Sequence, residues 1–361
     1  MGHFRILDFW IDSDPPDFAR RPIDDRSTGG RGGNGRAQRL CAMESDEVEE
    51  AVRQRLLSYV TPHETCEDLF ARLAKTRVDL RTSLPFLQGS PDHQHEHQRQ
   101  RRGDGRLRVR AGQVMEICGT NDTCKTECLL QAAATCVLPK SCGGCSSNAI
   151  FMEMRSGMDP LRLVQILDSR IRRCQSSSSS GSQLLEESLR RFELVRCYNN
   201  VDLVCALKAL EQREREEEAA APSSQERPRR RLVLVDDISA FYWIDKSFDG
   251  GPGSAPRRRP ADRPYGLQGV YEAIASNLRR SAEALGAAVL ATRNLQIPPG
   301  GDPTKLGAPL PKAWQDLVSQ RVVLRRPNPS ANALVASWDL PKKPGTSFRF
   351  AVRDDSLEAL A

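Results

Sequence analysis

The sequence predicts an α/β fold in which helices flank a mostly parallel sheet, with an antiparallel extension towards the C-terminus. From Gly112 onward, short apolar runs alternate with helix-like segments, an order that forms parallel strands with right-handed crossovers. After residue 319 the apolar periodicity shortens to two and turn residues separate the runs, which is typical of antiparallel strands. A pattern for a phosphate-binding loop lies between the first parallel strand and the first helix of this domain. These observations favour one large α/β domain.

The strands and helices of this domain are expected at regular intervals. Asp159 followed by Pro160 is a good helix start, because Asp caps the first turn and Pro fits its first position. Parallel strands are expected at 113–118, 149–154, 192–197, 232–237 and 287–292, helices at 125–136, 160–173, 201–216 and 267–285, and antiparallel strands at 321–325, 333–338 and 347–352.

Segments of biased composition surround and interrupt the domain. The Gly/Arg-rich N-terminal stretch buries too little apolar area to offset the entropy lost on ordering, so we expect disorder there. Runs of Ser, of Glu and Arg, and of Gly, Pro and Arg are expected to loop out as solvated inserts. The expected organisation is a disordered extension at 1–43, a helical lead-in at 44–85, a polar insert at 86–111, a core at 112–352 with disordered inserts near 176–182, 211–230 and 249–265, and a C-terminal tail at 353–361.

The composition sets broad limits on the partners of the chain. Lys and Arg number 53 against 47 Asp and Glu, and the net charge of +6 permits contact with nucleic acid without demonstrating it. No apolar run approaches the roughly 20 residues that span a bilayer, so we expect no membrane partner. The 11 cysteines follow no secretory leader, and we expect reduced thiols.

The phosphate-loop pattern G-x-x-x-x-G-K-[ST] runs from Gly119 to Thr126, with Cys124 in place of the second Gly. Lys125 is expected to contact the terminal phosphates of a nucleotide, and the Thr126 hydroxyl to contact Mg²⁺. Backbone N–H groups of the loop and the helix N-terminus would surround the phosphates. The expected nucleotide-binding residues are Gly119, Thr120, Asn121, Asp122, Thr123, Cys124, Lys125, Thr126 and Asp236.

Asp236 ends an apolar strand and is expected to contact the same Mg²⁺ through water, while Asp237 either helps it or caps the following turn. Both the loop and Asp236 fall at carboxyl ends of parallel strands, where ligands of such sheets bind. Thr126 and Asp236 are therefore the expected metal contacts.

Cys124 is expected to weaken the site. A loop that wraps phosphates often needs a left-handed residue at this position, and a non-Gly residue in that conformation costs about 1–2 kcal/mol. Each charge-assisted hydrogen bond to a phosphate still contributes about 1.5–3 kcal/mol. Several such bonds outweigh one strained residue, so weak nucleotide binding is expected to survive.

Several motifs resemble the RecA-type recombinases, and in particular the eukaryotic recombinase paralogues. Gly112, Glu116 and Gly119 match the phosphate-loop strand of that family, and the run from Ser239 to Asp245 is its most distinctive match. Further matches are Leu138-Pro139-Lys140-Ser141, Leu161-Arg162-Leu163-Val164 and Lys312-Ala313-Trp314-Gln315, within a resemblance that covers about 64–350.

The resemblance implies a RecA-like P-loop NTPase core that binds ATP and Mg²⁺. It also implies a nuclear role in homologous-recombination repair of DNA double-strand breaks. The implied partners are the D-type recombinase paralogue, the larger paralogue complex, and single-stranded or branched DNA, on which the chain would support recombinase filaments.

The chain departs from the family at positions that matter for hydrolysis. Where active recombinases carry a water-activating Glu, this chain has Arg155, and loss of a general base typically costs about 10²–10⁴ in rate. Asn294 replaces a Gln that senses the terminal phosphate. With Cys124, these departures predict a site that holds nucleotide weakly or statically, and no catalytic residue is assigned. Three alternatives remain: Glu153 acts as the base instead, the chain is an active DNA-dependent ATPase, or it is a DNA-binding subunit with a vestigial site.

Other residue groups have weaker functional interpretations. Cys142 and Cys145 have zinc-knuckle spacing, but zinc needs four ligands and reduced thiols are the simpler expectation. Phe241-Tyr242-Trp243 either stacks on bases or packs beneath the loop. Arg257–Arg259 and Arg279-Arg280 are candidate contacts to DNA phosphates.

Overall fold

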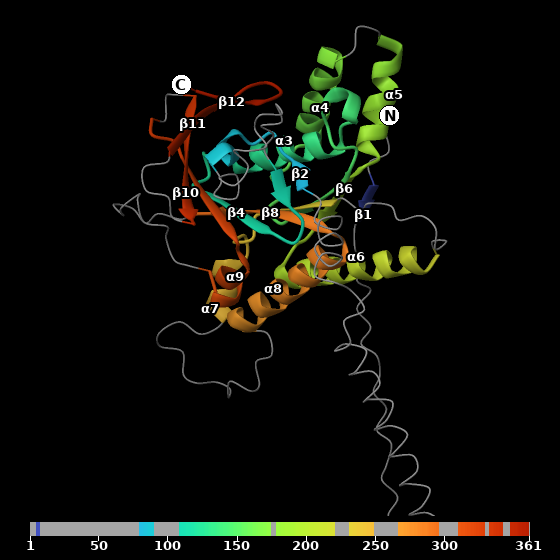
Figure 1. Ribbon diagram of the computed structural model, residues 1–361. Helices are drawn as coiled ribbons and strands as arrows, with labels where there is room; N and C mark the ends of the chain where they lie inside the picture. Colours follow the sequence, from blue (N-terminus) through green and yellow to red (C-terminus); the bar gives the residue numbers. More distant parts are fainter. Residues whose placement is uncertain are drawn as a thin grey trace, which may run out of the picture. The chain divides into compact units, whose positions relative to one another are not determined.

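A ten-stranded sheet organises the part of the chain that the computed structural model describes, namely residues 5–7, 79–89, 108–174, 178–220, 231–248, 266–295, 310–328, 332–341 and 347–360 (Figure 1). All of these residues belong to one of two compact units, which comprises residues 1–9 and 76–361. The strands of the sheet are β1 (Arg5–Leu7), β4 (Val114–Gly119), β5 (Asn148–Glu153), β6 (Phe192–Arg196), β7 (Arg231–Asp236), β8 (Ala287–Asn294), β9 (Gln320–Arg325), β10 (Ala333–Leu340), β11 (Ser347–Val352) and β12 (Leu357–Ala359).

The strand order is β1-β6-β5-β7-β8-β4-β9-β10-β11-β12. Neighbours from β1 to β9 are parallel, and β10 to β12 continue the sheet with antiparallel pairs. This confirms the predicted fold class, and the predicted strands agree with the observed ones to within about two residues. A separate antiparallel pair joins β2 (Asp79–Arg81) to β3 (Arg108–Arg110).

Helices cover both faces of the sheet because its strands carry apolar side chains on both sides. Along β7, Leu232 and Leu234 enter one buried cluster whereas Val233 and Val235 enter the other, as the two-residue period of a strand requires. The helices and short 3₁₀ segments are η1 (Pro85–Gly89), α3 (Lys125–Val137), η4 (Lys140–Cys142), α4 (Pro160–Cys174), α5 (Ser178–Leu189), α6 (Asn200–Ala220), α7 (Tyr242–Phe248), α8 (Leu267–Ala284) and α9 (Lys312–Leu317).

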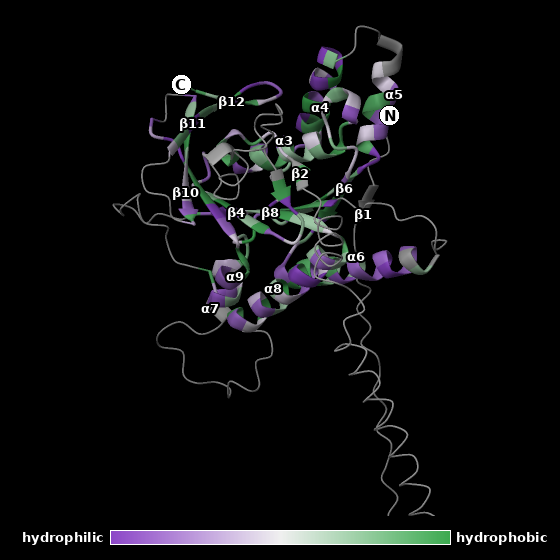
Figure 2. Cartoon of the chain, in the orientation of Figure 1, coloured by the Kyte–Doolittle hydropathy of each residue, from purple (hydrophilic) through white to green (hydrophobic). Residues whose placement is uncertain are grey.

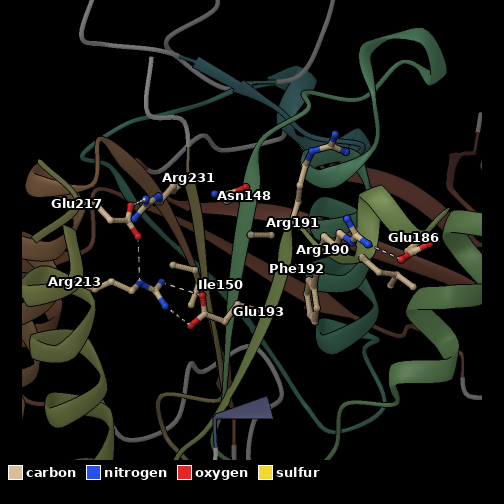
Figure 3. Close-up of a pocket in the computed structure, with 12 residues that line it drawn as sticks. Asn148, Ile150, Glu186, Arg190, Arg191, Phe192, Glu193, Arg213, Glu217 and Arg231 are labelled. Atoms are coloured by element: carbon tan, nitrogen blue, oxygen red, sulfur yellow. Dashed lines mark hydrogen bonds and ion pairs between the residues drawn. The ribbon is translucent and has the colours of Figure 1, made fainter. Parts of the chain in front are cut away.

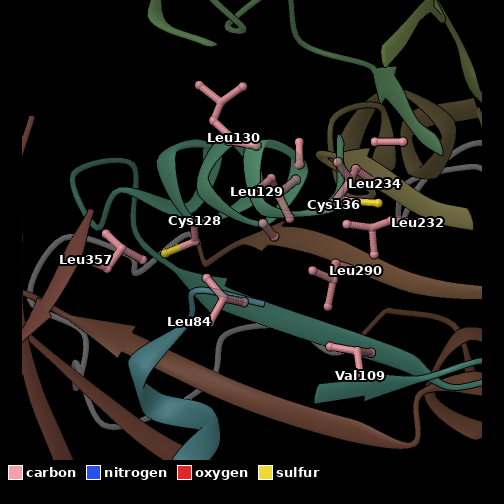
Figure 4. Close-up of a cluster of buried hydrophobic side chains, with 14 of the residues drawn as sticks. Leu84, Val109, Cys128, Leu129, Leu130, Cys136, Leu232, Leu234, Leu290 and Leu357 are labelled. Atoms are coloured by element: carbon pink, nitrogen blue, oxygen red, sulfur yellow. The ribbon is translucent and has the colours of Figure 1, made fainter. Parts of the chain in front are cut away.

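The first buried cluster lies beneath α3. Figure 4 shows Leu129 and Cys136 of this helix facing Leu232 and Leu290 of the sheet. α4, α5 and η1 contribute to the same cluster, while α6, α7, α8 and α9 pack on the other face. Green, apolar residues concentrate in the strands and purple, polar residues on the outer helix surfaces (Figure 2). This burial fixes the strand ends and hence the loops that follow them.

Two predicted inserts are wrong in part, because they contain helix. Residues 178–182 of the Ser-rich run begin α5, whose Leu184, Leu185 and Leu189 pack on the first cluster. Residues 211–220 continue α6, where ion pairs four residues apart join Arg213 to Glu217 and Arg215 to Glu211. Such pairs stabilise a helix that composition alone suggests is a solvated loop. Residues 221–230 and 249–265 lie outside the described part.

The predicted segments at the two ends of the chain also need correction. Within the expected lead-in and polar insert, residues 79–81 and 108–110 form strands, and Phe86 and Leu87 of η1 are buried. Residues 5–7 form β1 although disorder was predicted, and β12 lies in the predicted tail. Each strand is short and takes its stability from pairing with a neighbour, which local composition does not reveal. The remaining parts of 1–78 and 90–107 are outside the described residues.

Among the helices that the structure describes, none combines the length and apolar character needed to cross a membrane.

Candidate nucleotide site

The phosphate loop connects β4 to α3 and is held by its own polar groups. The Thr123 hydroxyl donates to the Thr120 carbonyl at 2.8 Å, and the Lys125 ammonium donates to the same carbonyl at 2.5 Å. Gly119 leaves no room for a side chain, since an added Cβ would lie 2.2 Å from the Thr123 hydroxyl oxygen. The strand end and the helix start therefore fix a tight turn, with Lys125 folded over it.

Cys124 occupies the N-cap of α3 with a left-handed backbone, at φ 56° and ψ 33°, and its side chain makes no capping hydrogen bond. The loop therefore has a left-handed residue at this position, as expected, and a non-Gly residue adopts that conformation. Burial raises the pKa of the Cys124 thiol, so the thiol form is favoured.

Thr126 and Asp236 meet across the sheet edge, although 110 residues separate them in sequence. The Thr126 hydroxyl donates to one carboxylate oxygen of Asp236 at 2.6 Å, and the Thr292 hydroxyl donates to the other. Asp236 is buried, and burial raises its pKa, while both hydroxyl hydrogen bonds oppose that rise. The two residues predicted to contact Mg²⁺ thus lie side by side.

Lys125 is a buried cation in an acidic surrounding. Burial lowers the pKa of its ammonium, and the carboxylates of Asp237 and Asp236 partly oppose that effect. The positive charge of Arg155 acts in the same direction as burial. The ammonium is therefore held at a site where an additional anion would be favourable.

The position expected for a general base holds the guanidinium of Arg155. Its Nη1 donates to the side-chain oxygen of Asn121 at 3.2 Å and to a carboxylate oxygen of Asp237 at 3.4 Å. The carboxylate of Glu153, the alternative base, is buried and accepts from the Met158 backbone at 2.8 Å and from Arg196 at 3.2 Å. A guanidinium stays protonated in proteins and cannot accept the proton of an attacking water.

Asn294 ends β8 directly beside the phosphate loop. Its register partner is Gly119 of β4, and its backbone N–H donates to the Ser239 hydroxyl at 3.0 Å. The shorter amide therefore occupies the strand position that the resemblance assigns to a phosphate-sensing Gln.

Three residues of the site were missed by the sequence analysis. Thr292 donates its hydroxyl hydrogen bond to Asp236. Ser239 donates to Asp237 from its backbone N–H at 2.7 Å and from its hydroxyl at 2.6 Å. Arg326 donates to the Asp122 carbonyl at 3.0 Å. Arg326 follows β9, which pairs with β4 in the sheet. Thr292 and Ser239 lie in motifs that the sequence singled out, but Arg326 had no signal because strand order alone brings it to the loop.

The residues present fit a nucleoside triphosphate with Mg²⁺. The start of α3 lacks a side-chain cap and Lys125 supplies a cation. Thr126 and Asp236 offer hydroxyl and carboxylate oxygens, which are the ligands that Mg²⁺ prefers.

A hollow of about 570 Å³ lies at the amino ends of β5, β6 and β7, the end of the sheet opposite to the phosphate loop (Figure 3). Its arginines pair with carboxylates: Arg213 binds Glu193 through two contacts of 2.9 Å, and Arg231 reaches Glu217 at 3.3 Å. Because these charges are neutralised within the hollow, they give no reason to expect a charged ligand.

The other expected sites have mixed outcomes. No group of three or more metal-ligating side chains occurs within the described ranges, which include Cys142 and Cys145. Tyr242 is buried, whereas Trp243 is 45% exposed and contacts the Lys246 ammonium, 4.8 Å from its ring centre. Arg279 and Arg280 are exposed on α8, and Arg257–Arg259 lie outside the described residues.

The parallel sheet with its antiparallel extension, and a phosphate loop facing a strand-end Asp, define a RecA-like protein of the P-loop class. The chain is 28% identical over 263 residues to DNA repair protein XRCC2 of Mus musculus, covering 68% of this chain and 85% of that protein. It is 25% identical over 321 residues to the DNA repair protein XRCC2 homolog of Arabidopsis thaliana, covering 74% of this chain and 78% of that protein. These similarities confirm the resemblance, because both relatives are named as XRCC2 DNA repair proteins. No family model matches the chain.

Proposed function

We propose that the chain is a nuclear subunit of the homologous-recombination machinery that repairs DNA double-strand breaks. Its similarity to two proteins named as XRCC2 DNA repair proteins supports the pathway, and the RecA-like fold suits assembly with other recombinase paralogues. The proposed partners are the D-type recombinase paralogue and the larger paralogue complex. In that complex the chain would support recombinase filaments on single-stranded or branched DNA.

We further propose that the chain binds ATP and Mg²⁺ with little or no hydrolysis. The observation that carries this proposal is the hydrogen bond from Thr126 to Asp236 beside the buried Lys125. Lys125 and the N-terminus of α3 would hold the phosphates, and Thr126 and Asp236 would hold the metal directly or through water. Bound Mg²⁺ would neutralise phosphate charge. Arg155 at the base position supports slow turnover, because it cannot accept a proton.

Nucleotide binding is tested by titrating the full chain with a fluorescent ATP analogue and Mg²⁺. We expect measurable binding that Lys125→Met removes, whereas the matched variant Lys140→Met, which changes an exposed lysine on η4, leaves it unchanged. Equal binding by wild type and Lys125→Met would contradict the proposed site.

Hydrolysis separates the proposal from the alternative of an active DNA-dependent ATPase. We expect no single-turnover hydrolysis above background, with or without single-stranded DNA. Hydrolysis that depends on DNA and disappears in Lys125→Ala would establish the alternative instead.

A DNA-binding subunit is a second candidate function, because Arg279 and Arg280 are exposed next to each other on α8. Phosphate contacts of this kind predict binding that weakens with salt and does not discriminate between sequences. Substitution of both arginines by Gln should reduce binding of the isolated chain to single-stranded DNA, and unchanged binding would argue against this surface.

We propose that the partner contact involves the N-terminal portion of the core. Deleting 44–85 should abolish capture by the D-type paralogue in a pull-down, and an unaltered pull-down would count against it.

A further inference from the structure

We propose that Arg155 makes the nucleotide site selective for the triphosphate form, by binding the terminal phosphate with its guanidinium. This inference rests on the proposed nucleotide binding and adds to it a residue that distinguishes ATP from ADP. It assigns a positive role to a side chain that otherwise counts only as a missing base.

The placement of Arg155 supports this role. It follows β5, yet its Nη1 reaches Asn121 in the phosphate loop after β4 and Asp237 after β7. In the sheet order, β7 and β8 separate β5 from β4. The guanidinium therefore spans the carboxyl edge of the sheet, between the phosphate loop that carries Lys125 and the carboxylate of Asp237.

The charges at this edge favour an additional anion. The Lys125 ammonium donates to the Thr120 carbonyl at 2.5 Å and Arg155 donates to the side chain of the next residue, Asn121, at 3.2 Å, so two positive charges lie close together and repel each other. Asp236 and Asp237 offset that repulsion, but Asp236 is already bound by two hydroxyl groups. A terminal phosphate between the two cations would relieve their repulsion, and a diphosphate would lack that group. A guanidinium also suits phosphate geometrically, because it donates two parallel hydrogen bonds.

Arg155 can leave its present partners at little cost. Its side chain is 45% exposed, and ion pairs of exposed groups contribute little to stability. Asp237 would keep the backbone and hydroxyl hydrogen bonds from Ser239 after Arg155 has moved. The loss of Arg155 as a partner therefore leaves no buried carboxylate without donors.

ATP bound in this way would be hydrolysed slowly or not at all. The same guanidinium that recognises the terminal phosphate occupies the position from which a carboxylate would activate water. The site would therefore keep ATP bound without converting it to ADP.

The test compares affinities of the full chain for a non-hydrolysable ATP analogue and for ADP, each with Mg²⁺, in wild type and Arg155→Gln. Since a charge-assisted hydrogen bond is worth about 1.5–3 kcal/mol, we expect wild type to favour the analogue by about tenfold or more. Arg155→Gln should remove most of that preference while changing ADP affinity by less than about threefold. Arg155→Lys should keep part of the preference, because it keeps the charge but not the paired donors.

Arg196→Gln is the matched control, because Arg196 also ends a neighbouring strand, pairs with Glu153 at 3.2 Å and has a side chain 38% exposed. It should retain the wild-type preference, and thermal unfolding should show that all variants fold. If wild type binds both nucleotides but Arg155→Gln leaves their ratio unchanged, the role of Arg155 is overturned while the nucleotide site stands. If wild type binds neither nucleotide, the proposed nucleotide site fails, and this inference fails with it.

Discussion

At the scale of single residues, the phosphate loop combines a strained backbone with a cluster of opposed charges. Cys124 adopts a left-handed conformation that favours glycine, and Lys125 is buried among carboxylates and a guanidinium. The strain at Cys124 lowers the stability of the folded loop, and the buried charge of Lys125 does so as well unless an anion compensates it.

The strain at Cys124 can be measured by comparing Cys124→Gly with Cys124→Ala. Both variants remove the thiol, but only glycine adopts the left-handed conformation freely. We expect the Gly variant to exceed the Ala variant in free energy of unfolding by about 1 kcal/mol, as measured by urea denaturation. If the Ala variant were equally or more stable, the backbone at this position would not be strained.

The affinity for nucleotide should depend on pH through Lys125 and Asp236. Burial lowers the pKa of Lys125 from its ordinary 10.5, so the charged ammonium that binds phosphate should be lost at a pH below that value. Burial raises the pKa of Asp236 from its ordinary 3.8, so the carboxylate should be protonated on acidification at a pH above that value. Titrations with Mg²⁺ and the ATP analogue over a range of pH would show both declines.

Lys125→Arg separates the two ends of that profile. Because arginine keeps its proton, the decline at alkaline pH should shift upward while the decline at acidic pH stays in place. An alkaline decline that is unchanged in this variant would mean that another group causes it.

At the scale of secondary-structure elements, buried polar contacts tie the central strand to its neighbours. Glu116 of β4 is fully buried and accepts from the Trp314 indole of α9 at 2.7 Å and from Arg321 of β9. The strand that leads into the phosphate loop is thereby fixed against β9 and α9. The position of the loop depends on this contact as well as on apolar packing.

Removing one partner should cost more than removing both. Arg321→Met leaves a buried carboxylate without its cation and should lower the free energy of unfolding by about 3–5 kcal/mol. The double variant Glu116→Met/Arg321→Met should recover part of that loss, because it also removes the buried carboxylate, although the Trp314 indole N–H then loses its acceptor. Denaturant unfolding of the three proteins would decide, and a double variant less stable than Arg321→Met would contradict the argument.

At the scale of the described unit, the C-terminal segment contacts α4, the helix that packs beside the phosphate-loop helix α3. Asp355, which is buried, pairs with Arg173, and its backbone carbonyl accepts from Arg170 at 2.9 Å. Arg170 also donates to Thr135 of α3 at 2.8 Å, and burial lowers its pKa to about 10. The end of the chain therefore takes part in holding α3 and α4 together.

We expect Asp355→Ala to lower the free energy of unfolding by about 1–2 kcal/mol, because it removes a buried acceptor of a charged donor. A chain that ends at Val352 should lose more, since β12 is removed as well. Glu358→Gln is the control, because Glu358 pairs with Arg353 on the surface and should change stability by less than about 0.5 kcal/mol. Equal effects of Asp355→Ala and Glu358→Gln in thermal or urea unfolding would contradict this role.

The sequence alone determined the alternation of strands and helices, the phosphate loop and the strand-end Asp236, because each depends on residues that are close together in the chain. Only the tertiary structure decided that Thr292 and Arg326 belong to the site, since β8 and β9 become neighbours of β4 through sheet pairing. It also decided that the Ser-rich and Glu/Arg-rich runs form the ends of α5 and α6, where packing of Leu184 and Leu189 and ion pairs outweigh weak local preference. The physical reason is the same in both cases: contacts between distant segments carry free energies that a short stretch of sequence does not contain.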